Sequence, residues 1–213
     1  MSERFLHENI YRGTAAMNSI NQIPVALCGV GAVGSNLAVN LARQGFASLI
    51  LIDGDRIEPH NLGTQVWTEA EVGLFKAECL RNRLFDDLGL EVEARAKMLG
   101  EKNAKKLLKD ATIVVDSFDN SKSRQIVKTY CASENLVCLH VGLNANYAEV
   151  IWNESYRVPS DLGEDVCDYP LARNLIMLAV SVASESLIRF ITTAEKKSYT
   201  ITLGDFAVRE YHS

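Results

Sequence analysis

A glycine-rich turn near the start of the chain limits the possible folds more than any other feature. Gly29, Gly31 and Gly34 are spaced as G-x-G-x-x-G and directly follow the short apolar run VALC at residues 25–28. Glycines at these positions permit a tight turn, close approach of backbone amides to a phosphate group, and close packing of the next helix on the strand. The turn therefore predicts a strand, a nucleotide-binding loop and a helix, in that order.

The segments after this turn continue the alternation of strands and helices. Residues 35–44 have apolar side chains at helical spacing, and residues 48–53 form a second short apolar run. Strand, turn, helix and strand make a parallel unit whose loops at the carboxyl ends of the strands are free to bind a ligand. Further helices are predicted at 75–87, 101–109, 121–134 and 171–190. Further strands are predicted at 92–96, within 111–120, and at 135–141, 147–152, 198–203 and 206–211.

This order of elements predicts an α/β fold. We expect a Rossmann-like, doubly wound and mostly parallel sheet in the N-terminal half, with antiparallel strands added toward the C-terminus. The alternating polarity of residues 147–152 favours an antiparallel strand there. With 213 residues and 47% hydrophobic composition, residues 1–213 are expected to form a single domain.

Composition narrows the partners and the location. The net charge of −5 provides no basic field and disfavours nucleic acid as a partner. We find no signal peptide and no apolar run of about 18 residues, so we expect no membrane association and a cytoplasmic location. The five cysteines form no C-x-x-C pair, which argues against a disulfide framework and a zinc site.

Polar residues after the second strand help to choose the nucleotide. Asp53 stands about 20 residues after the turn, where such folds hold a ribose. NAD and ATP could both use these features, but Asp55, Asn61 and Gln65 then gather polar groups beside the loop. Lys76 offers a mobile positive charge suited to a polyphosphate; the alternative for it is a surface lysine on an amphipathic helix.

Two acids end the strand predicted within residues 111–120. Asp116 and Asp119 lie in VVDSFDN, at the same sheet edge as the glycine turn. Hard carboxylate oxygens at this place suit Mg²⁺ bound to phosphates. We assign the metal role to Asp119, whereas Asp116 could instead cap the next helix.

Together these motifs resemble the ThiF/MoeB/HesA superfamily of ATP-dependent activating enzymes, relatives of the ubiquitin-activating enzymes. The matching segments are the glycine turn, DGDRIEPHNL, Gln65, VGLFKAE and VDSFDN, in that order across residues 25–120. The segment SESLIRF, which contains Glu185, resembles the family's A-x-E-A-I-K.

The resemblance implies an ATP-dependent adenylyltransferase that works as a homodimer. Such enzymes transfer AMP from Mg-ATP to a carboxylate, often the C-terminus of a ubiquitin-like or sulfur-carrier protein, and release pyrophosphate. By motif match, Asp53 would hold the ribose, Asn61 and Lys76 the phosphates, and Asp119 the Mg²⁺. Lys76 and the metal would then stabilise the negative charge that builds on the α-phosphate.

Three departures from the family pattern bear on activity. Thr64 precedes Gln65 where the family usually has arginine, which implies slower adenylation or another arginine in its place. Arg12, in preference to Arg4, is the candidate for the N-terminal arginine that relatives extend into the partner subunit's site. The two zinc-binding C-x-x-C pairs of many relatives are missing. Cys167 lies where thiol-using relatives keep a reactive cysteine, although the acids around it would disfavour the thiolate.

Two alternative functions follow from the same residues. Thr64 and the short chain are compatible with a weakly active or non-catalytic ATP-binding relative that serves as a scaffold or regulatory subunit. An NAD-linked oxidoreductase is disfavoured, because no catalytic constellation for hydride transfer accompanies the glycine turn.

Overall fold

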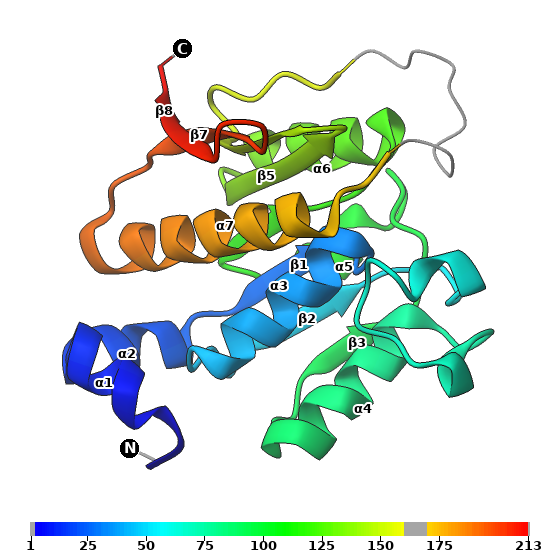
Figure 1. Cartoon of the computed structure of the whole chain (residues 1–213), viewed down its shortest axis with the longest axis horizontal. Helices are drawn as coiled ribbons and strands as arrows, with labels where there is room; N and C mark the ends of the chain where they lie inside the picture. Colours follow the sequence, from blue (N-terminus) through cyan, green and yellow to red (C-terminus); the bar gives the residue numbers. More distant parts are fainter. Residues whose placement is uncertain (1–2, 160–169, 213) are drawn as a thin grey trace.

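The computed structural model describes residues 3–159 and 170–212 and contains one eight-stranded sheet (Figure 1). Its strands are β1 (Val25–Cys28), β2 (Leu49–Ile52), β3 (Glu93–Arg95), β4 (Ile113–Asp116), β5 (Val137–Asn144), β6 (Tyr147–Trp152), β7 (Ser198–Thr202) and β8 (Ala207–Tyr211). They lie in the order β3-β2-β1-β4-β5-β6-β7-β8. The pairing is parallel from β3 through β2, β1 and β4 to β5. The strands β6, β7 and β8 extend the sheet with antiparallel pairing.

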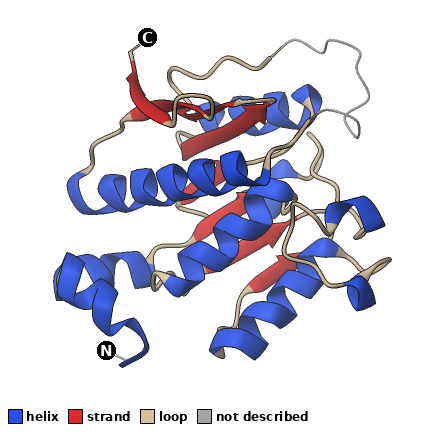
Figure 2. Ribbon diagram, viewed as in Figure 1, coloured by secondary structure: helices blue, strands red, loops and turns tan. Residues whose placement is uncertain are grey.

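Helices cover both faces of the sheet (Figure 2). The helices of the described residues are α1 (Leu6–Arg12), α2 (Thr14–Gln22), α3 (Ala32–Arg43), α4 (Lys76–Leu88), α5 (Ala104–Leu108), α6 (Ser121–Ser133) and α7 (Arg173–Thr193), with 3₁₀ turns at Glu3–Phe5, Pro59–Asn61 and Glu69–Glu71. Residues of α2, α3, α4 and α7 form one core cluster with the sheet, and residues of α5 and α6 form the other.

Strand β1 shows why a short apolar run can support both clusters. Val25 and Leu27 belong to the cluster under α3 and α7, whereas Ala26 and Cys28 belong to the cluster under α5 and α6. Successive side chains of a strand point to opposite faces, so a strand covered on both sides must be apolar at every position. All four residues are fully buried.

The predicted fold class is confirmed, including the antiparallel strand at residues 147–152, which has the bounds of β6. Helices α1 and α2 were not predicted. α1 has seven residues and buries none of them, so the sequence contains no run of core-facing positions long enough to identify this helix.

Helix α7 bears on the expectation that the chain contains no apolar run of about 18 residues. Among the described residues it is the helix long and apolar enough to cross a membrane by length and composition, with a mean hydropathy of 1.7. Half of that window is buried within the fold, and α7 packs along α3 and the sheet. The buried apolar side chains of α7 are part of the larger core cluster, in agreement with the helix predicted at residues 171–190.

Chain order reverses between β1 and β4, and this determines where a ligand can bind. β2 and β3 lie on one side of β1, whereas β4 and β5 lie on the other. The connections leave the sheet in opposite directions at this point, which opens a crevice at the carboxyl ends of the two strands. The glycine turn follows β1 and the segment Ser117–Asp119 follows β4, so both border this crevice.

Candidate functional site

A cleft of about 500 Å³ occupies this crevice, a volume typical of small-molecule sites. Most residues predicted for the site line it: Gly29, Gly31, Asp53, Asp55, Asn61, Gln65, Lys76 and Asp119. The connections after β1, β2 and β4 contribute these side chains, so segments far apart in the sequence meet at one edge of the sheet.

The three glycines of the turn have distinct structural roles. Gly29 has φ +84°, a left-handed conformation that favours glycine. A Cβ atom on Gly34 would lie 2.0 Å from the carbonyl oxygen of Gly29, so only glycine permits α3 to approach the turn this closely. Gly31 precedes the first residue of α3 and lines the cleft. The positive end of α3 therefore faces the cleft, as an anion site requires.

Asp53 is a buried carboxylate held by backbone amides. Its Oδ2 atom accepts a hydrogen bond of 2.7 Å from the Val30 N–H, and Oδ1 accepts one of 2.7 Å from the Asp55 N–H. Burial raises the pKa of Asp53 to about 6, although Lys76 and these two amides lower it. A ligand that donates hydrogen bonds to this group would favour its ionised form.

Lys76 is the first residue of α4 and lies beside Asp55. Its Nζ atom is 3.6 Å from the Asp55 carboxylate, and its backbone N–H donates to the Asp55 carbonyl at 3.0 Å. Because the Lys76 side chain is largely buried and lines the cleft, it is not an ordinary surface lysine. A positive charge that is largely shielded from solvent can stabilise an anion more strongly than it could in water.

Asn61 and Gln65 line the cleft, and the side-chain oxygen of each already accepts a hydrogen bond from another residue of the protein. Asn61 Oδ1 accepts the Glu58 N–H at 2.9 Å, and Gln65 Oε1 accepts the Trp67 indole N–H at 2.6 Å. These bonds fix the two amides in position within the loop. The predicted phosphate contact of Asn61, and any ligand contact of Gln65 through a donor, would come from the side-chain NH₂ group.

Asp116, the last residue of β4, and Asp119, which follows it, lie in different surroundings. Asp119 is exposed at the cleft wall. Asp116 is fully buried, and its Oδ2 atom lies 2.7 Å from His140 Nδ1. The suggestion that Asp116 caps α6 is wrong, because the Asn120 side chain caps this helix through the Ser123 N–H.

The donors of the cleft fit a magnesium ion that arrives with phosphates. Among the described residues, no three His, Cys, Asp or Glu side chains gather as a metal cluster. Mg²⁺ commonly uses one or two carboxylates together with substrate phosphates and water. The single exposed carboxylate of Asp119 suits that arrangement, whereas it could not hold a resident ion alone.

Comparison with known proteins connects this geometry with a family. The model of the ThiF family matches residues 6–200. The chain belongs to the ThiF family. It is 28% identical over 158 residues to the sulfur carrier protein ThiS adenylyltransferase of Bacillus subtilis (strain 168), covering 69% of this chain and 46% of that protein. It is 31% identical over 139 residues to the ubiquitin-like modifier-activating enzyme 5 of Caenorhabditis elegans, covering 60% of this chain and 33% of that protein.

The fold also agrees with solved structures. Escherichia coli MccB with ATP superposes with a TM-score of 0.82 at 20% identity, over all of this chain and 72% of MccB. At this identity the likeness shows a shared fold. The matched regions of this chain span less than half the length of these two curated ThiF-family relatives.

Thr64 stands where the ThiF family usually has arginine; one arginine contacts it, and another lines the same cleft. Arg173, the first residue of α7, donates from Nη1 to the Thr64 carbonyl at 3.2 Å. Arg56 lines the cleft, and its guanidinium stacks 3.9 Å from the centre of the Phe75 ring.

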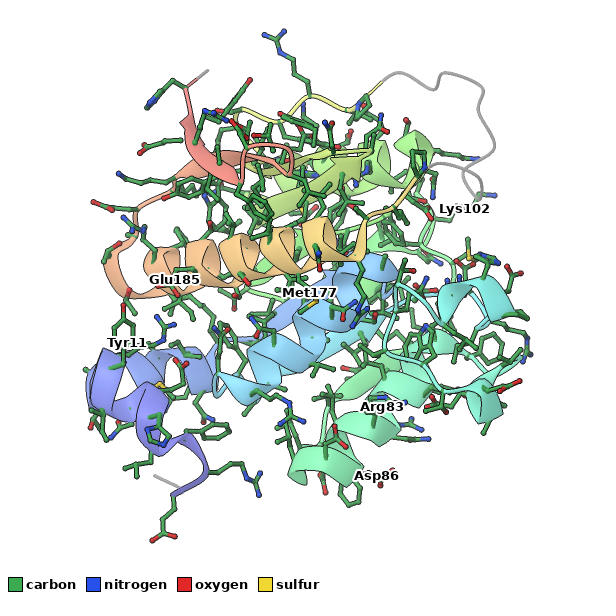
Figure 3. The ribbon with its side chains drawn as sticks, in the orientation of Figure 1. Tyr11, Arg83, Asp86, Lys102, Met177 and Glu185 are labelled. Carbon is green, nitrogen blue, oxygen red and sulfur yellow. The ribbon has the colours of Figure 1, made fainter. Side chains whose placement is uncertain are left out.

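Arg12 does not line the cleft of its own chain. It donates two hydrogen bonds to Glu185, at 3.0 and 2.8 Å, and one to Glu8 at 2.5 Å. Figure 3 shows that neighbouring Tyr11 and Glu185 lie where α1 approaches α7. Cys167 lies outside the described residues, so its predicted role stays a prediction.

Sequence reasoning missed several residues of the cleft, among them Ser117 and Arg124. Ser117 donates its hydroxyl to the Gly29 carbonyl at 2.8 Å and so joins the loops after β1 and β4. Arg124 lines the cleft and lies in the first turns of α6. Its position, five residues after Asp119 on a helix predicted to leave the same sheet edge, was a usable signal for an arginine near the site.

Proposed function

We propose that this chain is an ATP-dependent adenylyltransferase for a carboxylate, with the C-terminus of a ubiquitin-like or sulfur-carrier protein as the substrate class. The observation that carries the proposal is that the α3 N-terminus, Asp53, Lys76 and Asp119 line one cleft. The names of ThiF-family relatives, which include an adenylyltransferase of a sulfur carrier and an activating enzyme of a ubiquitin-like modifier, support the substrate class.

Each group in the cleft has a place in this reaction. Asp53 accepts hydrogen bonds from ribose hydroxyls, and the amides at the start of α3 receive phosphate oxygens. A carboxylate oxygen attacks the α-phosphorus, a new O–P bond forms, and the bond to the β-phosphate oxygen breaks as pyrophosphate leaves with its electron pair. Lys76 stabilises the added negative charge on the phosphates. Mg²⁺, held by Asp119, would supply further charge stabilisation when it is bound.

The proposal includes a cytoplasmic homodimer in which Arg12 serves the partner's site. Support comes from the exposed apolar residues of α1, with Ile10 71% and Tyr11 80% exposed. A surface of this kind is typical of association between subunits. Within one chain, Arg12 is occupied by Glu185, so this role requires exchange of one carboxylate partner for another anion.

Pyrophosphate exchange into ATP tests the proposed activity. The purified protein, Mg-ATP and labelled pyrophosphate would be incubated with each of a panel of ubiquitin-like and sulfur-carrier proteins that end in Gly-Gly. Exchange is expected with one acceptor and not with its C-terminally amidated form. Tight Mg-ATP binding without exchange for any acceptor would support the non-catalytic alternative instead.

A further inference from the structure

A buried arginine lies on the side of the cleft away from Asp53. Asp53 follows β2, whereas Arg124 lies beside Val141 of β5. β2 and β5 are three positions apart in the sheet, which corresponds to about 14 Å at the usual strand spacing. Arg124 therefore lines a part of the cleft distinct from the part proposed for the ribose.

Three neighbours contact the Arg124 guanidinium, and the Glu149 carboxylate lies close enough to interact with its charge. Nη1 donates to the Tyr156 hydroxyl at 3.0 Å and lies 3.8 Å from the Asp116 carboxylate. Nη2 donates to the Val141 carbonyl at 2.9 Å. A guanidinium has five N–H donors, and within the described part of the chain these are its two hydrogen bonds. Donors therefore remain for a ligand.

The groups that hold Arg124 are themselves fixed. The Tyr156 ring stacks on His140, with ring centres 3.8 Å apart and planes within 10°. His140 is fully buried, with Nδ1 2.7 Å from Asp116 and Nε2 2.8 Å from Asn153 Oδ1. Such a network keeps a charged donor in one orientation before a ligand arrives, which lowers the cost of reorganisation during binding.

The surroundings of Arg124 suit a carboxylate on an extended tail. Val141, Leu143 and Leu171 provide an apolar wall beside it, where a charged hydrogen bond is stronger than in water. Arginine binds a carboxylate with two parallel hydrogen bonds. The other lysine and arginine side chains of the cleft, Lys76 and Arg56, belong to segments after β2.

We propose that Arg124 binds the carboxylate that is to be activated, while Val141, Leu143 and Leu171 contact the chain that carries it. This inference rests on the proposed function. Arg124 holds the carboxylate as an anion, which is the form that attacks the α-phosphorus, so no proton transfer is needed. One oxygen remains bound to Arg124 while the other forms the bond to phosphorus as pyrophosphate leaves.

Calorimetric titration of peptides tests the assignment. The protein would be saturated with Mg²⁺ and the ATP analogue AMPCPP, and titrated with short peptides ending in Gly-Gly, Gly-Asn or Gly-Ala, each with a free or an amidated C-terminus. The wild-type protein is expected to prefer at least one free acid by 10-fold or more. Arg124→Gln should abolish this preference, Arg124→Lys should restore part of it, and Arg189→Gln, which changes an exposed arginine of α7, should leave it intact.

Nucleotide binding separates failure of this inference from failure of the proposed function. AMPCPP affinity should stay within about 3-fold in every variant, because the proposal places Arg124 against the acceptor carboxylate and not against the phosphates. A wild-type protein that fails to bind Mg-AMPCPP would refute the proposed function. Nucleotide binding without any preference for a free acid, or a preference unchanged by Arg124→Gln, would overturn the role of Arg124. If Arg124→Gln fails to fold, Tyr156→Phe decides, since it removes one hydrogen bond to Arg124 and should weaken the preference several-fold.

Discussion

At the scale of single residues, the cleft contains two carboxylates in contrasting surroundings, Asp53 as the proposed ribose acceptor and Asp119 as the proposed magnesium ligand. Asp53 is buried and accepts hydrogen bonds from two backbone amides, whereas Asp119 is exposed and has few contacts. Burial shifts the pKa of a carboxylate, whereas an exposed carboxylate can be replaced with little change in the free energy of unfolding. These two carboxylates can therefore be tested separately.

Replacement of Asp119 should uncouple nucleotide binding from magnesium. In Asp119→Ala, the gain in ATP affinity caused by Mg²⁺ is expected to fall by about 10-fold or more, because the Asp119 carboxylate is the proposed protein ligand of the metal. The unfolding midpoint should change little, since Asp119 is exposed. Asp87→Ala, which removes an exposed carboxylate from α4, is the matched control. An unchanged magnesium effect would remove Asp119 from the site.

Nucleotide affinity should fall as the pH falls through about 6. In the proposed site the ionised Asp53 carboxylate accepts ribose hydroxyls, and burial raises its pKa to about 6, so protonation should compete with binding below that value. Between pH 7.5 and pH 5, we expect adenosine affinity to decrease by roughly 10-fold, since one unit below the pKa leaves about a tenth of the group ionised. Adenosine is the suitable probe because it has no phosphate that titrates in this range.

The Asp53→Asn variant provides the control for this pH profile. It should bind adenosine weakly at every pH and show a flat profile from pH 5 to 7.5. A sloping profile in the variant would assign the titration to another group.

At the scale of elements, the contact between α3 and β1 determines whether the glycine turn can form. Gly34→Ala would place a Cβ atom 2.0 Å from the Gly29 carbonyl oxygen and 2.7 Å from Ser117 Oγ. We expect a loss of about 3 kcal/mol in the free energy of unfolding, because backbone atoms must move. Gly100→Ala, whose Cβ atom would have no neighbour within 4 Å, should change stability by less than about 0.5 kcal/mol. Urea unfolding of both variants measures the difference, and similar stabilities would contradict the packing role of Gly34.

The sequence was sufficient to predict those elements that can be recognised from residues adjacent in the chain. The apolar runs of β1, β2 and β4 are buried on both faces, so they stand out from their neighbours in the chain. α1 buries nothing and leaves no such pattern. The buried pair of Asp116 and His140 depends on the pairing of β4 with β5, which places the two residues opposite each other. No spacing within one segment encodes such a pair, and for that reason Asp116 was misjudged as a helix cap.

At the scale of the whole molecule, the position of Arg12 connects oligomeric state with catalysis. Arg12 binds Glu185 in its own chain and lies outside the cleft. If it serves the partner's site, Arg12→Ala and Lys76→Met should each lower the exchange rate by 10²-fold or more as separate homodimers. A mixture of the two variants should then recover up to about a quarter of wild-type activity, because a mixed dimer contains one site with both side chains intact.

Two controls accompany this complementation experiment. Sedimentation of each variant should give the mass of a dimer, and unmixed samples should stay slow at the same total concentration. Full activity of Arg12→Ala alone, or the mass of a monomer for the active wild-type protein, would exclude a role for Arg12 across the interface.

Thermal unfolding with added nucleotides tests the central claim most directly. The purified protein would be heated with Mg-ATP, ATP without metal, NAD and NADP in separate samples. A ligand at about 100 times its dissociation constant adds roughly 2.7 kcal/mol to the free energy of unfolding, which is readily visible as a higher midpoint. We predict a clear rise with Mg-ATP, a smaller one with ATP alone, and loss of the difference in Asp119→Ala. A rise with NAD or NADP and none with Mg-ATP would contradict the adenylyltransferase account.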